Sequence, residues 1–417
     1  MSHKSFYLNT LWQYGLQIVK YILPLLVMPY LTRVLGPDSY GVYAYILSFM
    51  TFAQTFVDFG FNLSGTNQIV AARTIREQEE VVGAISQARL FLCLITGVAC
   101  AAIGFFMPIV RANAMYALIS YVAVCTRSLA PDFLFQGREQ MGPLTTRYLV
   151  SKSVSVLLTF LLVRSSADLL WVPILDVVAG LIALGWSFVA AKRRFGVGIR
   201  FTSASRAISE LVRSGYYCAS NMASVALSGV TTLVIGVAIT DTTQIAYWSL
   251  AMSAIGAVQS LYGPIVNSLY PHMVNKKDFT FAMRLAKISI PFILLGSIAF
   301  YCLSDLIVLV LGGDKYVGAG TVLHAISPVV PLSFYAMYFG WPILGAIGHV
   351  KKLTNSTIVI SILGAVALLI ACISGFASVL MFALIRDLIE LVLCLARGLL
   401  VARALQEQHL CKAESAA

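Results

Sequence analysis

The stretch NTLWQYGLQIVKYILPLLVMPYLT, residues 9–32, contains a single charged side chain, Lys20. About 20 predominantly apolar residues in a helix cross the hydrocarbon core of a bilayer. Pro24 and Pro29 would break a helix in a soluble protein, but transmembrane helices tolerate proline when neighbouring groups satisfy the freed carbonyls. The stretch is therefore predicted to be a transmembrane helix, and we expect it to be retained as the first span rather than removed as a signal peptide.

The rest of the chain has the same character. Of its 417 residues, 59% are hydrophobic and 11% are charged, and its mean hydropathy is +0.85. These values lie far outside the composition of globular proteins. Further apolar segments predict spans at 40–66, 82–109, 114–136, 144–164, 169–191, 211–239, 243–270, 281–311, 319–346, 352–373 and 377–402. We expect an all-α integral membrane protein of about twelve transmembrane helices, with no sizeable soluble domain.

The basic residues indicate how the chain is oriented. With the N-terminus in the cytoplasm, 22 basic residues, including Arg89, Arg147 and Lys152, fall on the cytoplasmic side. Four fall on the other side, namely Arg33, Arg111, Arg164 and Lys315. Since cytoplasmic loops are enriched in Lys and Arg, both termini are predicted to be cytoplasmic.

The longest polar stretch divides the chain into two halves. It lies between the sixth and seventh predicted spans and contains Lys192, Arg193, Arg194, Arg200 and Arg206. The predicted organisation is an N-terminal six-helix lobe at 1–191, a cytoplasmic linker at 192–210, a C-terminal six-helix lobe at 211–403 and a cytoplasmic tail at 404–417. An even number of spans in each half makes the two lobes a parallel repeat.

Polar side chains form a stripe on the first helix of each predicted lobe. Asn9, Gln13, Gln17 and Lys20 fall within about 80° of one another on a helical wheel, and Pro24 lies on the same side. An offset of 204 residues maps this stripe onto a second one, which consists of Arg213, Tyr217, Asn221, Ser224 and Ser228. Both helices are therefore expected to turn a polar face inward.

Ionisable residues inside spans are the candidates for function. A lysine at mid-span costs about 2.5 to 3.5 kcal/mol on insertion scales, so Lys20 is expected to face water or an anionic ligand, or to pair with Asp58. Arg127 has the same standing. The candidate substrate-binding residues are Lys20, Gln13, Gln17, Arg127, Arg213, Asn221 and Ser224, and the candidate ion-coupling residues are Asp58, Asp176, Asp387 and Glu390.

Some of these acidic residues have a structural alternative. Arg386 and Glu390 have the i,i+4 spacing of a helix ion pair, so they could stabilise the fold rather than serve transport. Asp132, Asp305 and Glu210 lie near the ends of predicted spans and are expected to face the membrane interfaces.

No enzymatic constellation is found in the sequence. The eight cysteines are scattered and the five histidines are dispersed, so no metal site or cofactor is predicted. No glycine-rich phosphate loop occurs, and the predicted exterior loops are too short to house the acceptor site of a polymerase or ligase. Because the positive charge is distributed by membrane side, no nucleic-acid partner is expected. We expect a transporter rather than an enzyme.

Three runs carry a resemblance to a known family. They are PYLTRVLGPDSYG at 29–41, VDFGFNLS at 57–64 and PDFLFQGREQM at 131–141. Together they resemble the polysaccharide-transport family of lipid-linked oligosaccharide flippases, which includes the O-antigen flippases and belongs to the multidrug/oligosaccharidyl-lipid/polysaccharide exporter superfamily. Phe133 stands where members of that family usually carry Trp. Span number and order extend the resemblance over the whole chain, whereas the motifs lie in its first 150 residues.

The resemblance implies both a fold and a function. The fold would be two six-helix lobes around a V-shaped cavity that opens alternately to the cytoplasm and the periplasm. The substrate would be a sugar repeat unit on undecaprenyl pyrophosphate, moved between the leaflets of the bacterial inner membrane. A polysaccharide polymerase and a chain-length regulator would be partners, and no cofactor is implied.

Two alternatives to a flippase remain. A multidrug or cation extruder of the same superfamily would need an anionic cavity, which the basic residues Lys20 and Arg213 argue against. A membrane polysaccharide polymerase or ligase is disfavoured by the short exterior loops.

The charge asymmetry predicts the outcome of topology mapping. Reporter fusions after Ala417 and near Gly198 should report a cytoplasmic location, and a fusion at Asp314 should report a periplasmic one, because basic residues are retained in the cytoplasm. Alkaline phosphatase and green fluorescent protein activities of the fusions measure this. A cytoplasmic signal from the fusion at Asp314 would overturn the arrangement of twelve spans.

Overall fold

The computed structural model describes residues 3–239, 241–263, 265–266, 269–270, 273 and 279–414. Helices are the only regular secondary structure in these ranges. Contacts divide the chain into two compact units, Met1–Val225 and Ala226–Ala417. Helix α9 (Ala204–Ala238) begins in the first unit and ends in the second. The predicted lobe boundary at 192–210 stays a prediction.

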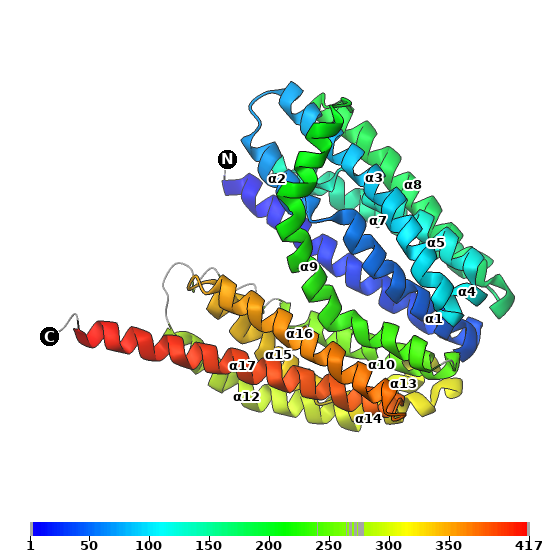
Figure 1. The fold of residues 1–417 in the computed structure, drawn as a ribbon, viewed down its shortest axis with the longest axis vertical. Helices are drawn as coiled ribbons and strands as arrows, with labels where there is room; N and C mark the ends of the chain where they lie inside the picture. The colour runs from blue at the N-terminus through cyan, green and yellow to red at the C-terminus, as the bar shows by residue number, and fades with distance from the viewer. Residues whose placement is uncertain are drawn as a thin grey trace. The chain divides into compact units, whose positions relative to one another are not determined.

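The first unit is built from long helices joined by short turns. They are α1 (His3–Asp58), α2 (Phe61–Ala71), α3 (Ile75–Phe106), α4 (Pro108–Ala112), α5 (Ala114–Ser128), α6 (Asp132–Gly137), α7 (Met141–Leu162), the 3₁₀ turn η1 (Ser166–Leu170) and α8 (Trp171–Phe195). Helix α8 packs along α5 and α7, and α1 contacts both of these helices (Figure 1). Four helices therefore surround the interior of this unit.

The second unit is also helical in its described part. It contains α10 (Thr242–Ser260), α12 (Phe279–Cys302), α13 (Ser304–Gly312), the 3₁₀ turn η2 (Asp314–Tyr316), α14 (Gly318–Ile326), α15 (Val329–Phe339), the π-helix η3 (Gly340–Gly345), α16 (Val350–Ile373) and α17 (Val379–Glu414). Helix α17 packs along α14, α15 and α16. Pro342 lies within the π-helix and has no N–H to donate, which accounts for the local departure from α geometry.

Seven of the described helical segments are long and apolar enough to cross a membrane. They are Leu11–Ala71, Ile75–Phe106, Ala114–Gly137, Ser166–Phe195, Phe279–Cys302, Gly318–Gly345 and Val350–Ile373. Large apolar side chains such as Leu94, Val98 and Leu295 are exposed, as lipid-facing residues are. The expectation of an all-α integral membrane protein is confirmed, while the exact number of spans and their orientation stay predictions.

Besides the turn at Gly196 that ends α8, left-handed backbone occurs at three turns of the first unit. Gly36, with φ of 70°, interrupts α1, so that this helix consists of two segments. Phe59 and Gly60, with φ of 45° and 76°, separate α1 from α2. Glu139, with φ of 54°, follows α6. These turns fall within the three runs that carry the family resemblance.

The polar linker is fastened to the first unit. The main-chain N–H and the hydroxyl of Thr202 both donate to Oε1 of Gln87 in α3, at 3.0 and 2.8 Å, and Nε2 of Gln87 donates to the carbonyl of Thr202 at 3.1 Å. The main-chain N–H of Gly198 donates to Glu79 at 2.9 Å. At the end of the linker, Glu210 accepts a hydrogen bond from Gln68. The segment is therefore held along α2 and α3.

Gly180 sets the distance between α5 and α8. A Cβ atom at this position would lie 2.2 Å from Oγ1 and 2.9 Å from Cβ of Thr126. Real Cβ atoms do not approach other atoms so closely, so this close contact of the two helices requires glycine. It places Arg127 of α5 next to the polar face of α8.

Replacing Gly180 with valine should therefore destabilise the protein. Overpacking a well-packed interior costs about 1 to 3 kcal/mol. We expect a lower midpoint of thermal unfolding for the purified Gly180→Val variant in detergent. Gly185→Val is the matched control, because Gly185 is on the same helix and a Cβ there would meet no atom within 4 Å. Equal midpoints for both variants would refute this role of Gly180.

Candidate functional site

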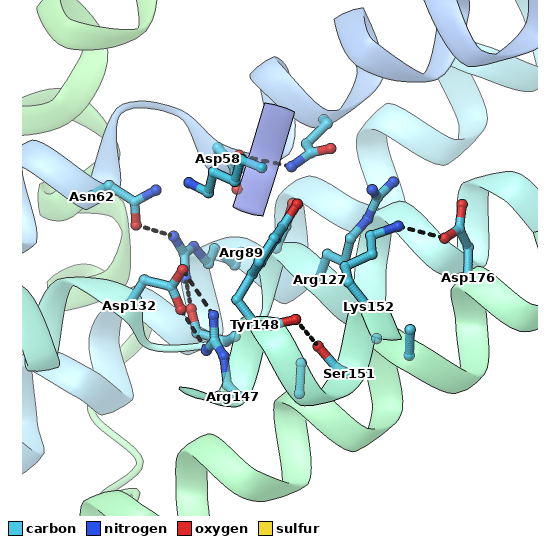
Figure 2. A pocket seen from close by; sticks show the side chains of 17 residues that line it. Asp58, Asn62, Arg89, Arg127, Asp132, Arg147, Tyr148, Ser151, Lys152 and Asp176 are labelled. Atoms are coloured by element: carbon cyan, nitrogen blue, oxygen red, sulfur yellow. Dashed lines mark hydrogen bonds and ion pairs between the residues drawn. The ribbon is translucent and has the colours of Figure 1, made fainter. Parts of the chain in front are cut away.

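A polar cavity of about 370 Å³ lies inside the first unit. Its lining comes from α1, α2, α3, α5, α6, α7 and α8, and the labelled side chains converge on one space (Figure 2). Five cationic side chains line it, namely Lys20, Arg89, Arg127, Arg147 and Lys152. Three carboxylates line it as well, Asp58, Asp132 and Asp176. The fully ionised cavity thus carries an excess of two positive charges.

Arg89 is a structural cation of this cavity. Its side chain is almost completely buried, and its guanidinium donates to the carbonyl of Ala130 at 2.8 Å and to Oδ1 of Asn62 at 3.2 Å. The rings of Phe61 and Phe133 lie 5.8 and 5.6 Å from the guanidinium carbon. The carbonyl of Ala130 lies in the break between α5 and α6, where it also accepts the main-chain N–H of Asp132 at 2.9 Å. Arg89 therefore connects α3 to α2 and to this break.

Two further cations form ion pairs within the cavity. Nη1 of Arg147 in α7 lies 2.7 Å from Oδ1 of Asp132, and Nη2 lies 3.2 Å from Oδ2. Nζ of Lys152, also in α7, lies 2.7 Å from Oδ1 of Asp176 in α8. In the Arg147–Asp132 pair, the two contacts between guanidinium and carboxylate fix the geometry of both groups. These pairs neutralise two of the three carboxylates.

Lys20 and Arg127 form no such ion pair within the described part of the chain. Nζ of Lys20 lies 5.7 Å from the centre of the Tyr148 ring, and the side chain of Lys20 is exposed. Nε of Arg127 is buried without a hydrogen-bond partner. Neither side chain forms an ion pair within 4 Å with any residue that the structure describes. The two cations line the same cavity and remain available to an anion.

Asp58 is the carboxylate of the cavity that lacks a salt bridge within the described part of the chain. It is the last residue of α1, and Nε2 of Gln54 one turn earlier donates to it at 3.5 Å. The structure does not pair it with Lys20, whose ammonium lies by Tyr148 instead. A carboxylate in this position can take up a proton without breaking an ion pair.

Only some of the residues proposed from the sequence line the cavity. Lys20, Arg127, Asp58 and Asp176 line it together. Gln13, Gln17, Arg213 and Asn221 are exposed and do not line it, and the side chain of Ser224 is outside the described part of the structure.

The two remaining acidic candidates lie in the second unit. Nη1 of Arg386 and Oε2 of Glu390 are 2.7 Å apart within α17, and both side chains are buried. This is the ion pair that the structural alternative requires. Asp387, next to Arg386, is half-buried on the same helix and belongs to the second unit.

Several residues of the cavity were assigned elsewhere by the sequence. Arg89, Arg147 and Lys152, which were counted with the cytoplasmic loops, lie inside the unit. Asp132 was predicted at an interface but lies in the cavity, and Glu210 is buried against Gln68. The exposed Asp305 is compatible with its predicted position. Without these three basic residues the charge asymmetry between the two sides remains large.

A signal for the α7 wall is present in the sequence. Arg147, Ser151, Ser155 and Thr159 recur at every fourth residue, and all four are buried. Residues at this spacing occupy one face of a helix. The face combines one charge with hydroxyl groups, which made it less conspicuous than the amide-rich stripe of the first helix.

Comparison with known proteins assigns the chain to a family. Residues 7–276 match the family described as polysaccharide biosynthesis protein. The chain belongs to this family. A protein of Escherichia coli strain K12 named "Putative O-antigen transporter" is 25% identical over 373 residues, which cover 85% of this chain and 87% of that protein. A protein of the same name from Shigella dysenteriae is 30% identical over 152 residues, or 36% of this chain and 37% of its own length.

Solved structures show the same fold. An inward-facing multidrug resistance transporter of the MATE family and the MOP superfamily superposes with a TM-score of 0.71 at 15% identity, covering 93% of this chain and 94% of that chain. The lipid II flippase MurJ in an inward closed conformation gives a TM-score of 0.72 at 13% identity, covering 95% and 87%. The chain is therefore a multi-pass inner-membrane protein of its family, and it shares the fold of these two transporters.

The contrast between Arg89 and Lys20 predicts different effects on stability. Arg89→Gln should remove the hydrogen bonds that the buried guanidinium donates to the carbonyl of Ala130 and to Asn62, and hydrogen bonds of charged groups contribute about 1.5 to 3 kcal/mol. Lys20→Gln should leave stability unchanged, since Lys20 has no hydrogen bond in the structure. Thermal unfolding of both purified variants in detergent measures the difference. An equal loss of stability in the two variants would contradict the division into structural and available cations.

Proposed function

We propose that the protein is a flippase that moves oligosaccharide repeat units linked to undecaprenyl pyrophosphate from the cytoplasmic to the periplasmic leaflet by alternating access. The observation that carries this proposal is the excess positive charge of a polar cavity inside a membrane-spanning unit. The family match, the relatives named as O-antigen transporters and the flippase among the structural neighbours support it. On this proposal the protein moves its substrate without changing it chemically and is not an enzyme.

The available cations suit the pyrophosphate of such a substrate. Lys20 presents a compact ammonium, and Arg127 presents a planar fork of donors that matches phosphate oxygens. The buried Nε of Arg127 has no partner in the structure, and an anion in the cavity would supply one. An anionic ligand would also offset the cost of holding two unpaired cations inside a membrane protein. We assign both residues to pyrophosphate binding.

The sugar units and the polyprenyl chain of the substrate are proposed to lie outside the polar cavity. The exposed side chains of Gln13, Gln17, Arg213 and Asn221 can hydrogen-bond to sugar hydroxyls. The polyprenyl chain would remain in the bilayer. A polymerase and a chain-length regulator would use the sugar units on the periplasmic side.

The carboxylates are proposed to couple transport to an ion. Asp58 is the strongest candidate, because it lies in the cavity without a salt bridge, whereas Asp176 is engaged by Lys152. Protonation of Asp58 would raise the excess positive charge and so favour an anionic ligand. Asp387 and Glu390 of the second unit remain secondary candidates for the same role.

A drug or cation extruder is the less favoured function. The fold is shared with MATE transporters, but a cavity with more cations than carboxylates repels a cationic drug. Efflux of a cationic dye by cells that lack their own pumps would favour this alternative over a flippase.

Substitutions of Lys20 test the proposed function. Lys20→Arg should retain substantial export of surface polysaccharide, because the charge persists, while Lys20→Gln and Lys20→Glu should lose it. Binding of inorganic pyrophosphate to the purified Lys20→Gln and Arg127→Gln variants should be about tenfold weaker, as expected for the loss of one charged contact. Export is measured in cells that lack their own flippase, with membrane levels of each variant compared by immunoblot.

Two outcomes would count against this assignment. Wild-type export by Lys20→Gln would remove Lys20 from substrate binding. Restored export by the double swap Lys20→Asp with Asp58→Lys would show that the two residues form a structural pair.

A further inference from the structure

A second cavity of the first unit is apolar. It has a volume of about 350 Å³ and lies between α1, α3 and α5. Phe49 and Met50 of α1, both buried, form its floor. Small residues of α3, namely Gly97, Cys100, Ala101 and Gly104, form one wall, and Ala114 and Ala117 of α5 form the opposite wall. We call this cavity the α3–α5 groove.

The groove offers a ligand little besides apolar surface along its length. Its walls carry one side-chain hydroxyl, that of Tyr121, and this group donates to the main-chain carbonyl of Cys93. From Gly97 to Phe105, the groove follows α3 for about 12 Å at the helical rise per residue. Neighbouring residues of α3, including Leu94, Val98 and Phe106, are exposed and face hydrocarbon. The groove is therefore open to a lipid chain rather than to a polar solute.

One cationic group lines the end of the groove. Arg111 of α4 is exposed, and its guanidinium carbon lies 5.9 Å from the centre of the Phe105 ring. Its guanidinium forms no hydrogen bond or ion pair with any residue that the structure describes. No carboxylate lines the groove. An apolar channel that ends at an available guanidinium is complementary to a hydrocarbon chain with a phosphate at its end.

We propose that the α3–α5 groove binds the isoprenoid chain of a polyprenyl phosphate or pyrophosphate, with its phosphate on Arg111. This inference rests on the proposed function, because the lipid carrier is then the anionic lipid that the protein must handle. Arg111 is one of the four basic residues predicted on the periplasmic side. The groove is thus a site for the carrier in the periplasmic leaflet, separate from the polar cavity that holds Lys20 and Arg127.

The test uses undecaprenyl phosphate as the probe and the purified full-length protein in detergent. Arg111→Gln removes the phosphate contact and should weaken binding about fivefold, since one basic residue contributes about that much to the binding of an anionic lipid. Ala101→Phe fills the groove and should weaken binding at least as much. The matched controls are Arg164→Gln, another exposed arginine on the predicted periplasmic side, and Ala102→Phe, the exposed neighbour of Ala101 that does not line the groove.

Native mass spectrometry of the protein with bound lipid gives the affinities. Unchanged affinity in both Arg111→Gln and Ala101→Phe would overturn the proposal. Equal competition by phosphatidylglycerol would also overturn it, because the groove would then bind anionic lipids in general. Stronger competition by polyprenyl phosphate than by phosphatidylglycerol or phosphatidylethanolamine would support it.

Binding of inorganic pyrophosphate separates this proposal from the function on which it rests. The groove variants should bind pyrophosphate as the wild type does, because Lys20 and Arg127 are untouched. A wild-type protein that binds undecaprenyl phosphate in the groove but does not bind pyrophosphate would retain the groove site and contradict the pyrophosphate-binding cavity.

Discussion

The free-energy cost of holding charge inside a membrane-spanning unit determines how the charged side chains of the first unit are arranged. Each ion taken out of water costs several kcal/mol unless it is paired or hydrogen-bonded. The structure meets this cost in two ways. Arg147 and Lys152 are paired with Asp132 and Asp176, and Arg89 donates hydrogen bonds to the carbonyl of Ala130 in the break after α5 and to Asn62. These contacts connect α3, α6, α7 and α8, so the groups that stabilise the unit also shape the cavity in which two cations stay available.

Much of the fold could be predicted from the sequence, because hydropathy alone marks helices that must lie in lipid. Lys20 and Arg127 could also be identified, since each lies inside a predicted apolar span rather than at its end. Arg147 and Lys152 could not, because they follow the start of a span so closely that a position in the cytoplasmic loop was equally consistent. Their depth depends on where α7 begins, and helix boundaries are the least reliable part of a prediction from sequence. The pairing with Asp132 and Asp176 is a tertiary contact that no local pattern encodes.

The three runs that carry the family resemblance contain turns with positive φ. Each contains a residue with positive φ, at Gly36, at Phe59 and Gly60, and at Glu139. Such turns end one helix and set the direction of the next, and residues other than glycine adopt them only at some cost. The second turn places Asp58 at the end of α1 and Asn62 at the start of α2, and both residues line the cavity. The resemblance thus lies partly in the turns that position polar side chains and not only in the residues that contact a ligand.

One wall of the polar cavity is shared with another cavity. A third space, of about 260 Å³, is bordered by α1, α5, α7 and α8, and Tyr43 and Thr159 line it. It shares four lining residues with the polar cavity, namely Arg127, Tyr148, Lys152 and Asp176. The membrane of a living bacterium maintains a voltage and a proton gradient, and a charge that crosses 100 mV releases about 2.3 kcal/mol. A continuous file of water through these two spaces would short-circuit that gradient. The Lys152–Asp176 pair and the ring of Tyr148 line both spaces, so they lie where such a file of water would have to pass.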